Sequence, residues 1–139
     1  MVYAFRPKKP VRSFRDLEVY QKTLECSVLV SADVAPKAEK LGFTRADALA
    51  LCALSVPLLV AEAHSLRFAD FPLALGYLEK AMAGCNKAVV YLDQLKGLYG
   101  GKANPDLLDD IAGRYLTARL KMFRLERSWQ QYRDRATEG

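Results

Sequence analysis

The strongest chemical signal in this 139-residue chain is a concentration of basic side chains between residues 114 and 135. Seven bases stand in that segment against two acids, a local net charge of +5. Guanidinium and ammonium groups bind phosphate oxygens, and charge repeated along one helix holds a nucleic-acid backbone without reading its sequence. We therefore expect nucleic acid to contact Arg114, Arg119, Lys121, Arg124 and Arg127. The alternative is a solvated helix face whose bases interact favourably with the helix dipole.

A second basic segment lies at the N-terminus. Residues 1–12 contain no acid, and their bases are Arg6, Lys8, Lys9 and Arg12. Pro7 and Pro10 favour extended backbone there and remove two amide donors. We expect a flexible basic arm that binds nucleic acid or another anionic partner. The same composition also suits a solvated leader that only aids solubility.

No set of residues converges on catalysis. His64 is the only histidine, and Glu62 is two residues away, which places the two side chains on different faces of a helix. The three cysteines lie far apart without the C-x-x-C spacing of metal or redox sites, so we expect reduced, packed thiols at Cys26, Cys52 and Cys85. The sequence thus predicts a protein that is not an enzyme and that uses no metal or cofactor.

Four helices are predicted to position the basic residues. Cap and turn residues divide the chain into helices at about residues 14–35, 45–65, 71–97 and 105–135. Ser13 and Asp16 have the spacing of a capping box at the first start, and Pro36 is expected to end that helix. Asp70 and Asn104 are expected to cap the third and fourth helices.

Apolar residues recur three and four positions apart along these segments, as on the buried face of a helix. The expected seams are Phe14, Leu17, Leu24 and Val28 in the first helix, Leu75, Leu78, Met82, Cys85, Val89 and Leu92 in the third, and Leu108, Ile111, Tyr115, Ala118, Met122, Leu125, Trp129 and Tyr132 in the fourth. The pattern predicts an all-α fold, an up-down-up-down antiparallel four-helix bundle over residues 13–136.

Apolar residues outside the seams predict association between subunits. Leu116, Leu120 and Phe123 stand three and four apart on a second face of the fourth helix. Residues 48–61 contain no charge at all, and this run includes Leu58 and Leu59. A helix that is apolar all round is normally buried all round, so we expect these five residues to lie in a homo-oligomer interface. The alternative is a second helix packed unusually deeply within one bundle.

Three short motifs resemble a known family. Residues 13–22 read SFRDLEVYQK, residues 55–62 read SVPLLVAE and residues 74–78 read ALGYL. Their order and separation are similar to those of the four-helix-bundle proteins encoded in intervening sequences of bacterial 23S ribosomal RNA genes. The chain departs from that pattern at Leu59, where the family usually has asparagine, and at residues 49–54, where LALCAL replaces a common arginine pair.

The resemblance implies a small homo-oligomer, typically a five-membered ring. A relative of that family, the accessory variability determinant of diversity-generating retroelements, is a basic pentamer that binds nucleic acid and a reverse transcriptase. The loss of the arginine pair moves the expected binding surface from the second helix to the fourth.

Together these observations predict a non-enzymatic, oligomeric bundle that binds structured RNA or other nucleic acid as an accessory or scaffold protein. The alternative is a protein-interaction module that docks on a partner such as a reverse transcriptase without touching nucleic acid. No uncharged run reaches the roughly 18 residues of a membrane span, and the N-terminus lacks the apolar core of a signal peptide, so we expect a cytoplasmic protein with no membrane partner.

Overall fold

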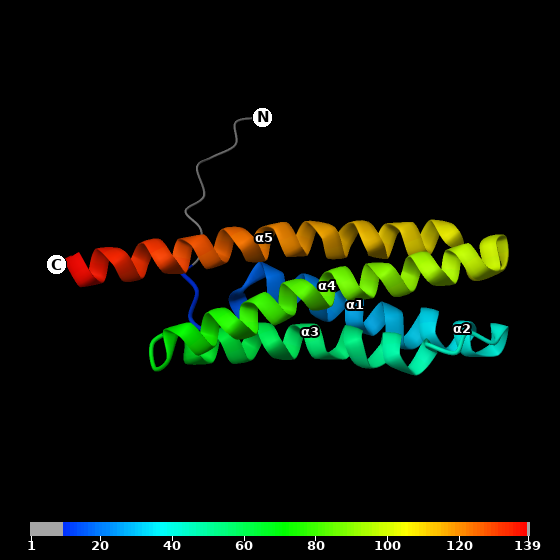
Figure 1. Cartoon of the computed structure of the whole chain (residues 1–139), viewed down its shortest axis with the longest axis horizontal. Coiled ribbons are helices and arrows are strands. Elements are labelled where there is room, and N and C mark those ends of the chain that lie inside the picture. Colours follow the sequence, from blue (N-terminus) through cyan, green and yellow to red (C-terminus); the bar gives the residue numbers. More distant parts are fainter. Residues whose placement is uncertain (1–9, 139) are drawn as a thin grey trace, which may run out of the picture.

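The computed structural model describes residues 10–138 and contains helices and no strand within that range. The helices are α1 (Glu18–Leu29), α2 (Ala35–Leu41), α3 (Ala46–Leu66), α4 (Phe71–Tyr99) and α5 (Pro105–Glu138) (Figure 1). A π-helical segment, Val30–Val34, joins α1 to α2, and short 3-10 segments occur at Phe14–Asp16 and Gly100–Ala103. The all-α prediction is confirmed. Arg6, Lys8 and Lys9 of the predicted arm lie outside the described residues.

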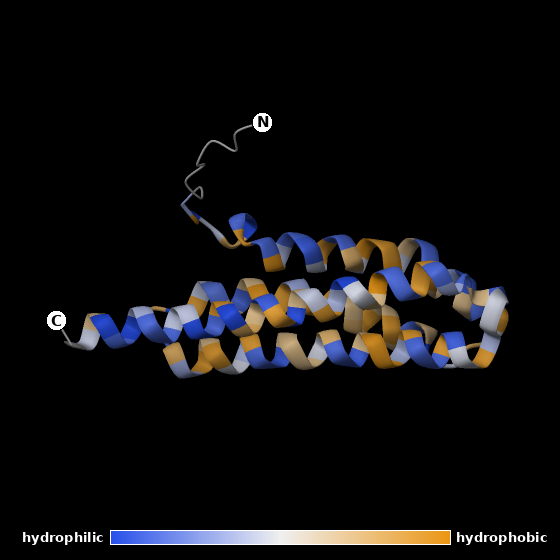
Figure 2. Cartoon of the chain, turned by 90° about the horizontal axis from the view of Figure 1, so that it is seen from above, coloured by the Kyte–Doolittle hydropathy of each residue, from blue (hydrophilic) through white to orange (hydrophobic). Residues whose placement is uncertain are grey.

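The helices pack as four rods. α3 packs against α1 and α4, and α5 packs against α4 and α1, so α3 and α5 occupy opposite corners of the bundle. Figure 1 shows the chain turning back at each connection, and α3 and α5 run in the same direction. The C-terminal end of α5 extends past the connection between α3 and α4, and Figure 2 shows that this end is mostly hydrophilic.

The predicted capping box forms, but it closes a 3-10 turn ahead of α1. The Ser13 hydroxyl accepts the amide of Arg15 at 3.2 Å, and the Asp16 carboxylate accepts the amides of Arg12 and Ser13 at 2.8 and 3.1 Å. These backbone hydrogen bonds, the one from Arg12 foremost, lower the pKa of Asp16. Leu17 is extended, and α1 begins only after it.

The first helical rod continues past the predicted end at residue 35 to Leu41. Pro36 lies in the first turn of α2, directly after the π-helical segment. A π-turn shifts backbone hydrogen bonds to a longer spacing, so the missing amide of proline costs less there than inside a regular helix. The rod ends at Gly42, whose φ of 95° is left-handed, and the amide of Phe43 reaches the carbonyl of Ala38 at 2.9 Å.

The buried face of α1 is not the predicted one. Leu24 and Val28 are exposed, and the buried side chains include Thr23 and Cys26. The Thr23 hydroxyl donates to the carbonyl of Val19 at 2.7 Å. Because this bond satisfies the hydroxyl within the helix, a polar residue enters the core at little cost and leaves two large apolar residues outside.

The seams of α4 and α5 largely match the prediction. Leu78, Cys85 and Leu92 of α4 and Ile111, Tyr115 and Met122 of α5 are buried. Tyr132, in the C-terminal part of α5, is an exception and is exposed. Asp70 caps α4 as predicted, since its carboxylate accepts the amide of Leu73 at 3.2 Å.

α3 is the central apolar element. Leu49, Ala53, Val56 and Val60 are fully buried on one side of it, and Pro57 is buried within the helix. α3 approaches α4 closely, because a Cβ built on Gly84 would lie 2.8 Å from Val56 Cγ2. By length and composition alone α3 could also span a membrane, a test that core helices of soluble proteins pass as well.

Candidate functional site

Two of the five basic residues predicted on α5 already have acidic partners. Arg114 pairs with Asp110 on the same helix at 3.1 Å, and Lys121 pairs with Glu18 of α1. The hydrogen bond that Arg114 donates to the Asp110 carboxylate is the main cause of the raised pKa of Arg114. Exposed pairs of this kind add little to stability, but they neutralise the charge that a phosphate would use.

Arg114, Asp110 and Lys121 line a groove between α1 and α5 that carries both signs of charge. Lys22 and Glu25 line it from α1, and Asp109 and Asp110 line it from α5. Asp109 in turn accepts two hydrogen bonds from Lys96 of α4, at 2.9 and 3.0 Å. A groove with interleaved acids repels a polyphosphate as much as it attracts one.

Arg119, Arg124 and Arg127 differ, because each is exposed and makes no ion pair with any residue that the structure describes. The Arg127 guanidinium lies 5.9 Å from the centre of the Phe123 ring. Of the four basic residues of the arm only Arg12 is described. It is exposed, and its amide is held by Asp16.

The predicted interface residues fall on two exposed apolar strips. The outer α5 strip consists of Leu116, Leu120 and Phe123, and the outer α3 strip of Leu51, Leu54 and Leu58; all six are between 45% and 67% exposed. Leu59 was expected beside Leu58, but it is partly buried against the core. Leu51 and Leu54 were missed, although their spacing from Leu58 is helical, because the whole of residues 48–61 is apolar and shows no period.

The two strips lie at the same level along the bundle. The rings of His64 on α3 and Trp129 on α5 meet across the bundle with centroids 6.3 Å apart. The outer α3 strip ends six residues before His64, the outer α5 strip ends six residues before Trp129, and both strips cover the same length. Because α3 and α5 run in the same direction, the strips face outward at one height from opposite corners.

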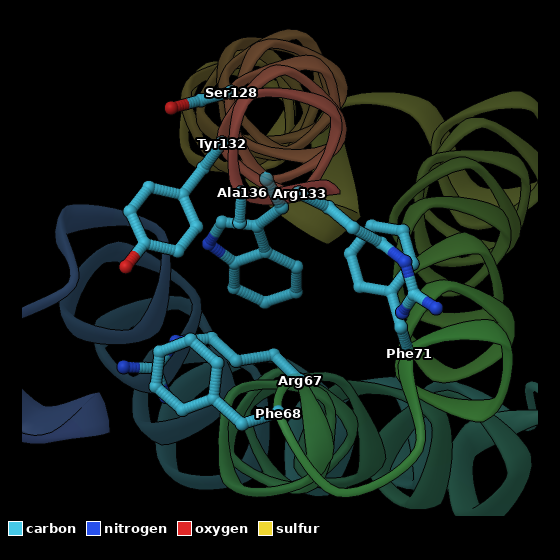
Figure 3. Close-up of a pocket in the computed structure, with 8 residues that line it drawn as sticks. Arg67, Phe68, Phe71, Ser128, Tyr132, Arg133 and Ala136 are labelled. Carbon is cyan, nitrogen blue, oxygen red and sulfur yellow. The ribbon is translucent and has the colours of Figure 1, made fainter. Parts of the chain in front are cut away.

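A cleft that the sequence did not predict lies where α3, α4 and the end of α5 meet (Figure 3). Its volume is about 370 Å³. We call it the aromatic–arginine cleft, after the side chains that line it: Arg67, Phe68, Phe71, Trp129, Tyr132 and Arg133. Figure 3 shows Phe68 and Arg67 reaching it from the α3 side and Tyr132 and Arg133 reaching it from α5. The lining residues come from two segments, 67–71 and 128–136, that lie far apart in the chain, so no local spacing could reveal the site.

Each arginine of the cleft lies over an aromatic ring. The Arg67 guanidinium carbon is 4.2 Å from the centre of the Phe68 ring, and that of Arg133 is 4.6 Å from Phe71. Arg67 also donates to the carbonyl of His64 at 2.7 Å, so it pairs with its own helix end and not with Glu62. The cleft therefore carries two positive charges, and no acid is among the described residues that line it.

The buried titratable groups are held in their neutral forms. Burial raises the pKa of the Cys26 thiol to about 11 and that of Cys85 to about 12, so neither is a thiolate at neutral pH. Burial also lowers the pKa of His64, with the nearby charge of Arg67 as the second cause. Within residues 10–138 no group of three or more histidine, cysteine or acidic side chains is arranged to hold a metal ion.

No known protein family, curated protein or solved structure matches this chain. The class defined by the fold is an all-helical bundle of four rods. The resemblance to the intervening-sequence family therefore rests on the three sequence motifs alone.

Proposed function

We propose that this protein is a non-enzymatic accessory bundle of the cytoplasm, built in the up-down-up-down antiparallel arrangement. In this proposal it assembles with copies of itself into a ring and binds nucleic acid, structured RNA above all. The observation that carries the proposal is the exposed, unpaired state of Arg119 and Arg124 on either side of the outer α5 strip, judged within residues 10–138. The short connections between successive helices support the antiparallel arrangement.

The common level of the two strips supports a ring of parallel subunits. Rotating a copy about an axis parallel to the helices brings the outer α3 strip of one subunit against the outer α5 strip of the next, with no shift along that axis. The two strips are different surfaces, so the contact is heterologous, and heterologous contacts related by rotation alone can close into a ring. A ring of five is the size that the family resemblance implies.

Charge next to the strips supports the same contact. Glu62 lies two residues before His64 on α3, and Arg127 lies two residues before Trp129 on α5, so they too share one level. Neither makes an ion pair with the part of its own chain that the structure describes. In the ring, Glu62 of one subunit faces Arg127 of the next, which assigns Arg127 to assembly.

Arg119 and Arg124 then remain for nucleic acid. One subunit offers few free bases, because Arg114 and Lys121 are paired with acids. A ring repeats each arginine once per subunit and so creates a field that a single chain lacks. Arg12 and the other arm residues, Arg6, Lys8 and Lys9, add further positive charge.

The test is the salt dependence of RNA binding. Fluorescence anisotropy with a labelled RNA hairpin should give an affinity that falls steeply between 50 and 200 mM salt, with a log–log slope of roughly 0.9 or slightly less per phosphate contact. The variants Arg119→Gln and Arg124→Gln should weaken binding several-fold and reduce that slope. Arg114→Gln is the matched control on the same helix, and we expect a smaller effect because Asp110 already pairs with Arg114.

Absence of binding at low salt, or equal effects of the Arg124 and Arg114 variants, would contradict the nucleic-acid proposal. The exposed strips favour one other function, a protein-interaction module that covers them with a partner such as a reverse transcriptase. This alternative predicts that the chain is monomeric on its own. It also predicts that a pull-down with the chain recovers a single protein, in a complex that survives nuclease treatment.

A further inference from the structure

We infer that the aromatic–arginine cleft binds an unpaired nucleobase together with its phosphate, an inference that rests on the proposed nucleic-acid function and deepens it. The cleft would make single-stranded or looped segments the preferred ligand. It lies apart from Arg119 and Arg124 and was not among the surfaces expected from the sequence. Its residues supply the two groups that bind unpaired nucleotides, aromatic faces and arginine forks.

The aromatic side chains at the mouth of the cleft are unusually exposed. Phe68 is 73% exposed and Tyr132 is 65% exposed, so both rings present faces to solvent. Their centroids are 6.4 Å apart with the planes tilted by 54°. A flat ring stacked between two aromatic faces needs a separation of about 7 Å, twice the carbon contact distance. Both rings are exposed and free to turn, so rotating them toward parallel planes and widening their spacing slightly would admit one base between Phe68 and Tyr132.

The arginines supply the complementary charge. Figure 3 shows Arg67 beside Phe68 and Arg133 beside Phe71, so the two guanidinium groups lie on opposite sides of the cleft. One donor of Arg67 is used by the His64 carbonyl, which leaves the rest of its fork for an anion. With two cations and no acid among its described lining residues, the cleft suits a ligand that is aromatic and negatively charged.

The size of the cleft favours one nucleotide over a longer segment of protein. A volume of about 370 Å³ lies at the small end of the range for pockets that bind small molecules. A helix or strand docking on the bundle would require a long apolar groove, whereas here four rings surround one space. Stacking on such rings tolerates any base, so we expect preference for unpaired over paired nucleotides and little preference for sequence.

Trp129 gives the experiment its readout, because it is the one tryptophan of the chain and it lines the cleft. The full chain is titrated with a six-nucleotide single-stranded RNA, with a duplex of the same length, and with an abasic strand of the same backbone. Single-stranded RNA should quench Trp129 fluorescence saturably. The abasic strand should bind at least about fivefold more weakly, since base stacking is absent.

Variants at the exposed Phe68 and Tyr132, together with one at the partly buried Arg67, locate the effect. Phe68→Ala and Tyr132→Ala should each weaken single-strand binding about fivefold or more, and Arg67→Gln should lower both affinity and salt slope. Leu98→Ala is the matched control, an exposed apolar side chain on α4 outside the cleft.

The outcomes separate this inference from the wider function. If RNA binds by anisotropy but does not quench Trp129, the inference about the cleft is overturned and the proposed function stands. The same holds if the Phe68 and Tyr132 variants bind RNA as tightly as the native chain. If an acidic aromatic peptide quenches Trp129 and the abasic strand binds as tightly as the intact strand, the cleft is assigned to a protein ligand. This result also overturns the inference that the cleft binds a nucleobase. If no RNA binds at low salt, both proposals fail.

Discussion

Pairing with acids decides which basic side chains of α5 are available to a ligand. Arg114 and Lys121 lie on one line of the helix and looked equivalent to Arg124 in the sequence, yet each has a carboxylate partner. One partner, Asp110, is four residues away and could have been anticipated from helical spacing. The other, Glu18, comes from a helix more than a hundred positions earlier, so only the packed structure reveals it.

His64 should make stability depend on pH near neutrality. Its folded pKa is lowered, so below the unfolded value of about 6.5 the unfolded chain binds more protons than the folded one. The stabilisation from neutral His64 is therefore complete above about pH 6.5 and is lost as the pH falls toward the lowered folded pKa. Urea denaturation at pH 7.5 and 5.5 should show the gap in stability between the native chain and His64→Gln narrowing at the lower pH.

The His64→Gln comparison isolates one group, because carboxylates such as Asp16 lose their contribution only at a much lower pH. The loss of packing against Trp129 lowers the stability of the variant equally at both pH values. A gap that stays constant or widens on acidification would contradict the prediction.

At the scale of elements, a buried face could be predicted where the apolar and polar sides of a helix differ clearly in sequence. α4 and α5 have clear apolar and polar faces, and most of their buried positions were predicted. α3 has no contrast over residues 48–61, so its exposed strip could not be separated from its core face. In α1 the hydroxyl of Thr23 is satisfied by its own backbone, and a polar residue took the place expected for Leu24. The end of the first rod was missed because a π-turn accommodates Pro36.

The close approach of α3 and α4 predicts opposite effects for two glycine substitutions in α4. Gly84→Ala should destabilise the bundle by about 1–3 kcal/mol, since its Cβ would meet the buried Val56 at 2.8 Å. Gly76→Ala is the control, with nothing within 4 Å of its Cβ, and should stabilise by up to about 1 kcal/mol through helix propensity. Urea unfolding at a fixed protein concentration measures both.

Adding Val56→Ala tests the cause of the Gly84 effect. The double variant should be less destabilised than the sum of the two single variants, because the clashing methyl group is gone. Simple additivity would show that contact with Val56 is not responsible.

At the scale of the whole molecule, the alignment of distant surfaces carries the functional argument. Sequence reasoning found the residues of the outer α5 strip and the exposed Arg119, Arg124 and Arg127, but the level shared by α3 and α5 depends on the contact between His64 and Trp129. The cleft likewise unites the start of α4 with the end of α5. Such relations arise from packing and leave no periodic trace in the chain.

Self-assembly should fail when either strip is charged. Leu58→Asp and Leu120→Asp should each yield a chain of 15.5 kDa by light scattering, where the native protein gives a multiple of that mass. Glu62→Arg and Arg127→Glu should each weaken assembly, and the two changes together should restore it, because the pair is reversed across the contact.

Val90→Asp is the control for the strips, since Val90 is an exposed apolar residue of α4 that belongs to neither. Its mass should equal that of the native assembly. A native chain that is monomeric at micromolar concentration, or a charge reversal that does not restore assembly, contradicts the proposed ring.

The shared direction of α3 and α5 has a consequence for how partners approach. Subunits related by rotation alone all point the same way, so the proposed ring has two unlike sides. One side gathers every aromatic–arginine cleft and the free ends of α5, and the other gathers α2 and the Gly100–Ala103 turns. A strand of RNA would then be held from one side only, which leaves the opposite side open to a second macromolecule.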